Sequence, residues 1–202
     1  MQKPLHFLRG VVATVFAMTL VACDDKGPDL QWQTITLKDA GLTTVFPVPC
    51  DIQAAHTMVD FGMGDGAVQV SMIGCDSPIT ASTYAVSQWL LDDPSRADDA
   101  LAFWQADVLS KLKAVDSKKE KSGASFVPQG AMQLSRSIRA TVEGERATGW
   151  TVTTHGVWFA RKEGNKARIF HAVIFAPKPQ HEIADIFFRG LKLQELTAPA
   201  SQ

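Results

Sequence analysis

The chain is short of several features that would point to a particular chemistry. It has three cysteines in 202 residues, and none of them forms a CxxC metal or redox motif. With 20 lysines and arginines against 21 acidic residues, it lacks the positive excess of nucleic-acid-binding proteins. No second long apolar run follows residue 22, which excludes a polytopic membrane protein. Serine-hydrolase, zinc-protease, P-loop and EF-hand motifs are also missing, so no motif names a reaction.

What the chain does carry, at its start, is the pattern of a secretory signal. Lys3 and Arg9 provide a basic segment, and residues 11–22 are apolar apart from Thr14 and Thr19. A basic segment, a short apolar segment and small residues at the end make up a signal peptide. The apolar run is too short for a membrane span, which needs about 20 residues. We therefore expect residues 1–22 to be a signal peptide.

The end of this run resembles the lipobox of bacterial lipoproteins. Leu20, Val21 and Ala22 precede Cys23, the residue that the lipobox requires. The resemblance covers only these residues and implies that signal peptidase II cuts before Cys23, which receives a diacylglyceryl group and then an acyl chain such as palmitate on its amine. Three acyl chains anchor a protein far more firmly than one. An ordinary signal peptide with a chance cysteine is the alternative.

Two acidic residues directly after the cysteine bear on location. Asp24 and Asp25 resemble the sorting signal that holds lipoproteins at the inner membrane of enteric-type bacteria. The resemblance implies a protein anchored in the inner membrane and facing the periplasm. The same residues also suit the acidic start of a tether, and an outer-membrane location is the alternative.

Cysteine parity supports the lipid anchor independently. Three cysteines in a secreted chain leave one thiol unpaired, and lipidation of Cys23 leaves Cys50 and Cys75 as an even pair. An oxidising periplasm permits a disulfide between them, worth about 3–4 kcal/mol by loop-closure entropy. Two buried thiols or a metal pair are less favoured, because no histidine ligand adjoins them.

The rest of the chain is long enough for one domain. We expect a tether at residues 23–30, a single globular α+β domain at residues 31–196 and a loose tail at residues 197–202. No internal repeat or low-complexity tract interrupts the domain.

Apolar periodicity and turn residues place the elements of this domain. Alternation predicts strands at residues 32–37, 42–46, 54–61, 67–73, 131–142, 150–161 and 167–176, with a short last strand at 191–196. Glycine-containing turns are expected at residues 62–66, 143–145 and 163–165. Helices are expected from residue 80 or 82 to residue 91, after Asp93 and Pro94, and at residues 180–189. Their predicted buried stripes are, in turn, Tyr84, Val86, Trp89 and Leu90; Leu101, Trp104, Val108, Leu112 and Val115; and Ile183, Ile186 and Phe187.

This order of elements resembles the PsbP-like family. The likeness rests on Val45-Phe46-Pro47 at an early strand end, on helices between two β blocks, and on residues 187–193, an aromatic-containing helix that runs into a terminal strand. It covers about residues 31–196. It implies a single-domain α/β/α sandwich whose mainly antiparallel sheet is covered by helices on both faces. The family acts by binding partners and has no shared catalytic residues to transfer.

Two histidines are the strongest candidates for a site. His155 and His171 lie on adjacent expected strands and share a face if the turn is centred on Gly164. A shift of one residue would place them on opposite faces. Because no third ligand accompanies them, structural histidines are favoured over a ligand or partner site, and we expect no metal and no cofactor.

Three other clusters have structural explanations. Residues 62–66 suit a hairpin turn better than a nucleotide loop, because a strand follows them. Acidic residues around position 95 are better explained by helix capping than by a cation site: Asp92, Asp93, Asp98 and Asp99. Lys118, Lys119 and Lys121 suit a solvated loop, with lipid headgroups as the alternative contact.

Two classes of function follow. The favoured one is a membrane-anchored, non-enzymatic module that binds a periplasmic protein, of which a toxin-neutralising immunity protein is one version. The second is a cell-envelope enzyme that acts on lipid or cell wall through a dispersed site with His155 or His171. The first is favoured because catalytic sites gather more titratable groups in one place.

Overall fold

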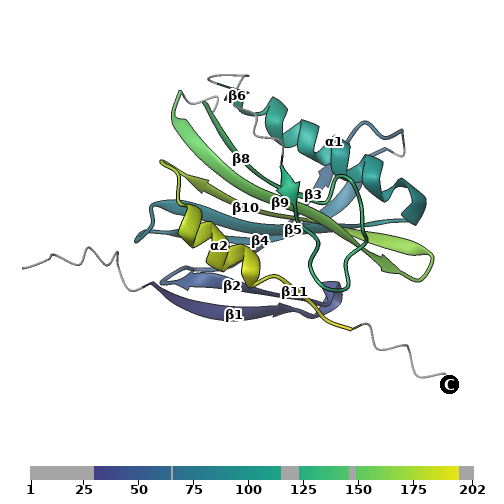
Figure 1. Cartoon of the computed structure of the whole chain (residues 1–202), viewed down its shortest axis with the longest axis horizontal. Helices are drawn as coiled ribbons and strands as arrows, with labels where there is room; N and C mark the ends of the chain where they lie inside the picture. The colour runs from purple at the N-terminus through teal and green to yellow at the C-terminus, as the bar shows by residue number, and fades with distance from the viewer. Residues whose placement is uncertain (1–29, 65, 115–122, 146–148, 196–202) are drawn as a thin grey trace, which may run out of the picture.

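The computed structural model describes residues 30–64, 66–114, 123–145 and 149–195. Two antiparallel β-sheets and two α-helices form the fold (Figure 1), and strands hold 51% of the described residues against 19% in helices. The expected α/β/α sandwich, with helices over both faces of one sheet, is therefore wrong. A second sheet takes a large part of the covering that we assigned to helices.

The larger sheet has eight strands and contains the middle of the chain. Its neighbours run in the order β3 (Gln53–Val59), β4 (Val68–Ser77), β5 (Ser82–Leu91), β10 (Lys166–Ala176), β9 (Thr151–Glu163), β8 (Ile138–Glu145) and β6 (Lys113–Ala114), and β7 (Ala124–Ser125) also pairs with β8. The longest hairpin joins β9 to β10, with Lys166 opposite Glu163. Its two-residue turn contains Gly164 at φ +64°, a conformation that favours glycine.

The smaller sheet has three strands from the two ends of the described chain. β1 (Gln31–Leu37) and β11 (Lys192–Leu193) flank β2 (Leu42–Val48). A 3₁₀ turn, Lys38–Ala40, joins β1 to β2 and ends at Gly41, whose φ is +51°. A Cβ at Gly41 would lie 2.8 Å from Arg161 Nη1, so glycine is required there for space as well as for conformation.

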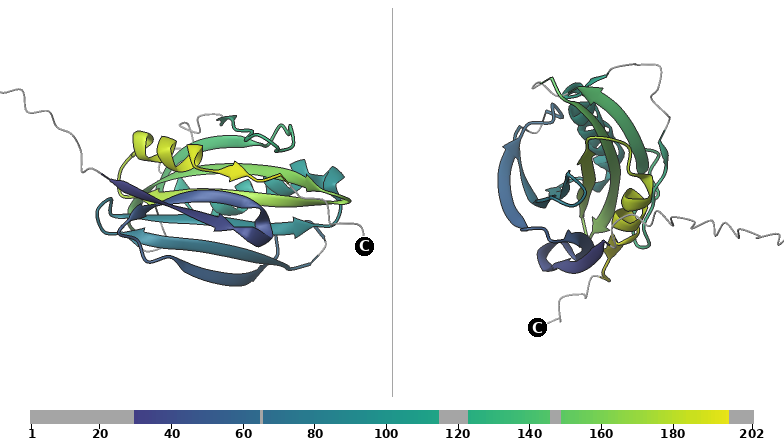
Figure 2. Two further views of the ribbon diagram at one scale, coloured as in Figure 1. Left: turned by 90° about the horizontal axis from the view of Figure 1, so that it is seen from below. Right: turned by 90° about the vertical axis from the view of Figure 1, so that its left-hand side faces the viewer.

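The two faces of the larger sheet are covered differently. Helix α1 (Ala97–Ser110) packs against one face, which we call the α1 face, and helix α2 (His181–Arg189) packs with the smaller sheet against the other, the α2 face. Figure 2 shows that the sheet is curved, with α1 on the inner side of the curve. Because side chains alternate along a strand, β9 and β10 contribute to both cores, which explains their nearly continuous burial.

Each face has its own aromatic core. On the α2 face, Phe187 packs edge-on against Phe46 and Tyr84, while Phe159 stacks on Phe170. On the α1 face, Leu101 of the helix is fully buried in a cluster with tryptophans and small residues. The sheet is therefore the shared wall between two hydrophobic cores.

Strand β5 corrects the largest error in the expected elements. Residues 82–91 form a central strand, whereas their apolar spacing predicted a helix. Tyr84 and Val86 point to the α2 face and Trp89 to the α1 face, while Leu90, expected to be buried, is 39% exposed. Burial on both faces removes the polar alternation that marks a strand in a sequence. Pairing with β4 and β10 decides the conformation instead.

Both remaining helices are confirmed. Asp93 accepts a hydrogen bond from the Ser95 N–H and caps a 3₁₀ turn, Pro94–Arg96, that leads into α1. Leu101 and Trp104 of the predicted stripe are buried in the α1 core. In α2, Phe187 is buried as expected. Ile186 was also expected to be buried, but its side chain is 40% exposed.

The borders of strand β8 differ from those expected from the sequence. Residues 143–145, expected to form a turn, lie inside β8, where Gly144 pairs with Val152. The strand expected from residue 131 begins only at Ile138. As predicted, β3 and β4 are separated by a glycine-containing segment, in which Gly62 and Gly64 have positive φ.

The Cys50–Cys75 disulfide is confirmed, with a Cα–Cα distance of 5.7 Å. It joins the segment after β2 to β4, and so links the smaller sheet to the larger one. Several predictions lie outside the described residues: the lipobox at Leu20–Cys23, the sorting pair Asp24 and Asp25, and the loop lysines Lys118, Lys119 and Lys121. Neither helix in the described part of the chain is long and apolar enough to cross a membrane.

Candidate functional site

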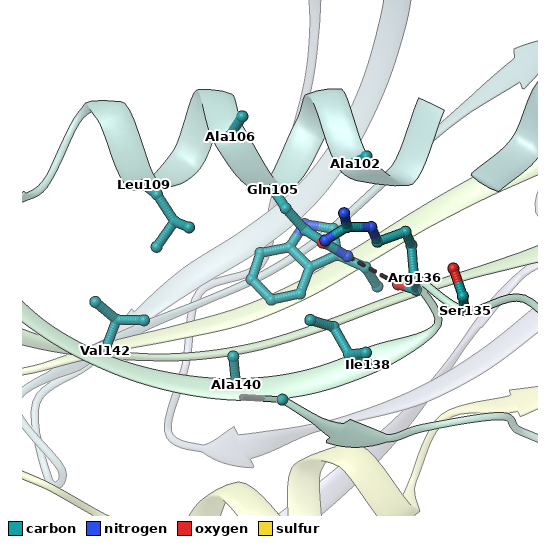
Figure 3. Close-up of a pocket in the computed structure, with 11 residues that line it drawn as sticks. Ala102, Gln105, Ala106, Leu109, Ser135, Arg136, Ile138, Ala140 and Val142 are labelled. Atoms are coloured by element: carbon teal, nitrogen blue, oxygen red, sulfur yellow. Dashed lines mark hydrogen bonds between the residues drawn. The ribbon is translucent and has the colours of Figure 1, made fainter. Parts of the chain in front are cut away.

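A groove opens between helix α1 and strand β8, and we call it the α1–β8 groove (Figure 3). Its volume is about 680 Å³, which is within the range of small-molecule binding pockets. The lining is mainly apolar and comes from α1, from β8, from β9 and from the segment before β8: Ala102, Gln105, Ala106, Leu109, Gly123, Ser135, Arg136, Ile138, Ala140, Val142 and Trp158.

Small side chains on both walls leave this space open. Ala102 and Ala106 lie one helical turn apart on α1, and Ala140 lies on β8 at the other side of the groove. On β8 the alternate residues Ile138, Ala140 and Val142 all point to the α1 face. The groove is therefore open because three residues that line it are alanines, which occupy less space than a leucine would.

The indole of Trp158 contributes to the lining from β9. Its six-membered ring lies over Gly156, two residues earlier on the same face, and a Cβ on that glycine would come within 2.6 Å of it. Trp158 is only 2% exposed, yet its Nε1 has no hydrogen-bond partner. This N–H is therefore a buried donor that no described residue satisfies.

Polar contacts hold the mouth of the groove in place. The Asp98 carboxylate at the start of α1 accepts hydrogen bonds from Ser135 Oγ at 2.6 Å and from the Arg136 N–H at 2.8 Å. Gln105 Nε2 donates to the Arg136 carbonyl at 2.8 Å. These bonds use the backbone of Arg136 and leave its exposed side chain free to extend across the mouth (Figure 3).

An aromatic row runs through the core beneath α1. Trp89 stacks on Phe61 at 5.4 Å between ring centres, Phe61 meets Trp104 at 5.3 Å, Trp104 meets His171 at 5.3 Å, and His171 stacks on Trp158 at 4.6 Å. Three buried ring nitrogens of this row have no hydrogen-bond partner among the described residues: Trp89 Nε1, Trp158 Nε1 and His171 Nε2. Such groups destabilise a fold by about 1–3 kcal/mol each.

The two candidate histidines do not come together. The register of β9 and β10 places His171 opposite Trp158 and His155 opposite Ile174. His171 therefore points to the α1 face and His155 to the α2 face, on opposite sides of the sheet. No shared ligand can bind both rings. Across the described residues, no three His, Cys, Asp or Glu side chains are grouped so as to hold a metal ion.

His155 is held in a hydrogen-bonded structural position. Its Nε2 accepts from the Gln180 N–H at 3.1 Å, just before α2, so its Nδ1 carries the proton and donates to Thr141 Oγ1 at 3.0 Å. Burial lowers the pKa of His155 from 6.5 to about 4, helped by the charges of His181 and Arg139. The ring is neutral and ties β8 and β9 to the start of α2.

His171 occupies a quite different position. Its ring lies between Trp104 and Trp158, and it is 5% exposed. Burial lowers the pKa of His171 to about 3, so the ring is neutral and packs as an aromatic side chain.

A buried arginine clasp closes the α2 face. Arg161 of β9 donates to the carbonyls of Ala40, Gly41 and Gln194, and so holds both ends of the smaller sheet. Its guanidinium also pairs with Glu163. Burial alone would raise the pKa of Glu163, but hydrogen bonds from Arg168 and Arg161 outweigh it and hold this pKa below its usual value.

In the acidic cluster, the expected capping role is seen at Asp93, whereas Asp92 and Asp98 make other contacts. Asp93 is a cap, and hydrogen bonds from Ser95 hold the pKa of Asp93 below its usual value. Asp92 pairs with Lys166 at 2.6 Å, and Asp98 binds the mouth of the groove, while Asp99 lies exposed in the first turn of α1.

Strand β3 forms a free edge of the larger sheet. It pairs only with β4 within the described residues, and six of its seven residues are exposed. Its sequence, QAAHTMV, has no charged residue and no proline, the features that usually protect an edge from pairing. The other long edge strand, β1, packs Trp32 and Ile35 against the α2-face core.

The sequence did not indicate either the α1–β8 groove or the exposed edge of β3. Ala102, Ala106 and Ala140 carry no chemical signal, because an alanine marks a groove only when the wall opposite it is known. Trp104 and Trp158 were assigned to separate elements, and only packing places them in one row with His171. The exposure of β3 was hidden because alternation does not tell which strand lies at the edge.

No protein-family model matches the chain, and a search of curated proteins found no significant match. Function is therefore argued from the groove, the edge strand and the N-terminal pattern.

Proposed function

We propose that the chain is a lipid-anchored protein of the bacterial cell envelope whose domain binds another protein. In this proposal Cys23 carries the lipid, Asp24 and Asp25 retain the protein at the inner membrane, and the domain faces the periplasm. An extended segment of the partner adds to strand β3. The free, uncharged edge of β3 is the single observation that carries the binding role.

A partner strand can bind this edge through its backbone. β3 presents a row of N–H and C=O groups over seven residues, and strand addition uses such a row for affinity. Met58 is 63% exposed and adds an apolar contact. Asp51 and Asp60 flank the strand, so a partner segment with basic residues at its ends complements the edge better than a second copy of the same edge.

The histidine-based enzyme is the less favoured alternative. Both ring nitrogens of His155 are engaged in hydrogen bonds, and His171 packs between two tryptophans. An immunity protein that blocks a toxin is a specific version of the favoured class, because strand addition by a toxin segment would use the same edge.

Affinity purification from solubilised membranes tests the binding role. Met58→Lys places a charge on the edge, and Gln69→Lys places the same charge opposite it on β4, one strand further in. We expect the native chain and Gln69→Lys to recover the same specific protein and Met58→Lys to lose it. Recovery of no specific protein, or equal recovery by both variants, contradicts the proposal.

Lipid labelling and fractionation test the anchor. Radiolabelled palmitate is expected to enter the native chain and not the Cys23→Ser variant, whose domain is unchanged. On a sucrose gradient we expect the native chain with inner-membrane markers, and recovery with outer-membrane porins contradicts the sorting role of Asp24 and Asp25. A label that enters both chains contradicts the anchor at Cys23.

A further inference from the structure

We propose that the α1–β8 groove binds a single-chain lipid anion, with the acyl chain along the alanine-lined walls and the anionic head at Arg136. This site is separate from the edge of β3. It does not depend on the partner-binding role or on the anchor.

The shape and lining of the groove suit an acyl chain. Most side chains on the walls between α1 and β8 are apolar: Ala102, Ala106, Leu109, Ala140 and Val142. Gln105 is the polar side chain on the helix wall, and its Nε2 already donates to the Arg136 carbonyl at 2.8 Å. The volume of about 680 Å³ exceeds what one apolar side chain of a partner needs, and the groove opens to solvent at its mouth. A flexible chain with only methylene groups can fill such a space without leaving a polar group unpaired.

The charge at the mouth selects the head group. No carboxylate in the described part of the chain pairs with the Arg136 guanidinium. The Asp98 carboxylate contacts this segment, but it accepts hydrogen bonds from Ser135 Oγ and from the Arg136 backbone N–H rather than from the guanidinium. The planar guanidinium is therefore free to form paired hydrogen bonds with a carboxylate or phosphate.

The Trp158 side chain forms part of the groove. Trp158 lines it with its Nε1 buried and unpaired. The same tryptophan provides a spectroscopic reporter of what enters the groove.

The test measures quenching of tryptophan fluorescence by brominated dodecanoate. It uses the mature chain with Cys23→Ser, which keeps every described residue and needs no detergent that would compete for the groove. We expect saturable quenching that falls in the Trp158→Phe variant. Unbrominated octanoate, decanoate and dodecanoate should displace the probe with affinities that rise about fourfold per methylene. Quenching that does not saturate overturns the proposal.

Head-group specificity is tested with matched ligands and variants. Dodecanol and dodecyltrimethylammonium have the same chain with no charge and with positive charge, and each should bind at least tenfold more weakly than dodecanoate. Arg136→Gln should remove most of this difference, whereas Lys178→Gln, the same loss of charge at an exposed site outside the groove, should not. Equal affinity of the three ligands for the native chain overturns the anionic head. Dodecyl phosphate against dodecanoate then tells which anionic head is preferred.

Filling the groove tests its location. Ala140→Leu on the β8 wall should abolish binding of all three ligands, and Ala102→Leu on the helix wall provides a second variant if the first unfolds. Circular dichroism and a melting curve establish that each variant is folded. Undiminished binding by both folded variants places the ligand elsewhere and overturns the proposal.

Discussion

The two faces of the larger sheet are built on the same strands but are finished in different ways. The α2 face is closed by a disulfide, by the Arg161 clasp and by a histidine whose two nitrogens are both hydrogen-bonded. In the described part of the chain, the α1 face is covered by one helix, contains three ring nitrogens without a hydrogen-bond partner and is hollowed by the α1–β8 groove. Buried hydroxyls without a partner also occur on the α2 face, at Thr44 and Ser77. The faces therefore differ in the disulfide and the clasp, which serve stability, and in the open space of the groove, which can serve binding.

Removing an arginine from each face should produce the largest difference between them. Arg161→Met leaves the carbonyls of Ala40 and Gln194 without their donor and removes one of two donors to the Gly41 carbonyl, which keeps the Gln194 N–H. It should lower the free energy of unfolding by about 3–5 kcal/mol. Arg136→Met removes an exposed side chain and should change it by at most about 0.5 kcal/mol. Urea unfolding measures both. Similar losses would show that the mouth of the groove is as tightly tied as the clasp.

The disulfide should stabilise the domain without shaping the groove. Replacing Cys50 and Cys75 together by alanine should cost about 3 kcal/mol, because the bond closes a loop with a sequence separation of 25 residues. The measurement is urea unfolding in a Cys23→Ser background, so that no free thiol remains to exchange. Dodecanoate binding should survive in the folded variant, and its loss would mean that the two faces are coupled.

The two histidines should respond alike to acid and differently to replacement. Each folded-state pKa lies below 6.5, so the unfolded chain binds more protons than the folded one below that pH. Stability should be complete above pH 6.5 and fall as the pH is lowered toward 4, by about 3 kcal/mol for His155. Unfolding curves between pH 4 and 8 measure this loss, and each replacement by phenylalanine should reduce its part of it.

At neutral pH the same replacements separate the faces. His155→Phe leaves the Gln180 N–H and the Thr141 hydroxyl without their partner and should cost about 1–3 kcal/mol. His171→Phe keeps an aromatic ring between two tryptophans and removes an unpaired nitrogen, so it should cost less. A larger cost for His171→Phe would contradict its role as a packed aromatic side chain.

Enlarging an alanine on each face tests where space is available. Ala172 of β10 is fully buried in the α2-face core, so Ala172→Leu should overpack it and cost about 1–3 kcal/mol. Ala140→Leu extends into the groove and should cost less than about 0.5 kcal/mol. Thermal unfolding compares the two variants directly. Equal destabilisation would mean that the groove has no room for three added carbons.

The smallest contrast concerns one polar atom on each face. Tyr84→Phe removes a hydroxyl that hydrogen-bonds to Thr80 Oγ1 at 3.1 Å and should cost about 1 kcal/mol. Trp158→Phe removes the unpaired Nε1 along with ring volume, so its cost should come from lost packing alone. Adding dodecanoate should stabilise the native chain more than Trp158→Phe in a melting experiment. Equal stabilisation would argue against contact between the ligand and the indole.

Local patterns were sufficient where local interactions decide the structure. Asp93 and Pro94 predicted the start of α1, and Leu101 and Trp104 predicted its buried side. Gly164 indicated the β9–β10 turn, because few residues other than glycine adopt the positive φ that this turn requires. The cysteine pair followed from parity. The helix expected at residues 180–189 likewise corresponds to α2.

Local patterns failed where strand pairing decides. Residues 82–91 have apolar residues at helical spacing, and only burial between β4 and β10 makes them a strand. The helix wrongly assigned there was a main reason for expecting an α/β/α sandwich. The groove could not be foreseen because its alanines come from separate elements, α1 and β8.

The sequence by itself determined the confirmed local elements and the disulfide partners, because caps, turn residues and cysteine parity act without knowledge of the rest of the chain. Cys23 and the residues around it are also the basis for the proposed lipid anchor and location at the inner membrane. The tertiary structure alone decided which strand is an edge, where the groove opens and which face each histidine occupies. The physical reason is the two-residue repeat of a strand: a register shift of one residue moves every side chain to the other face, and register is set by distant partners.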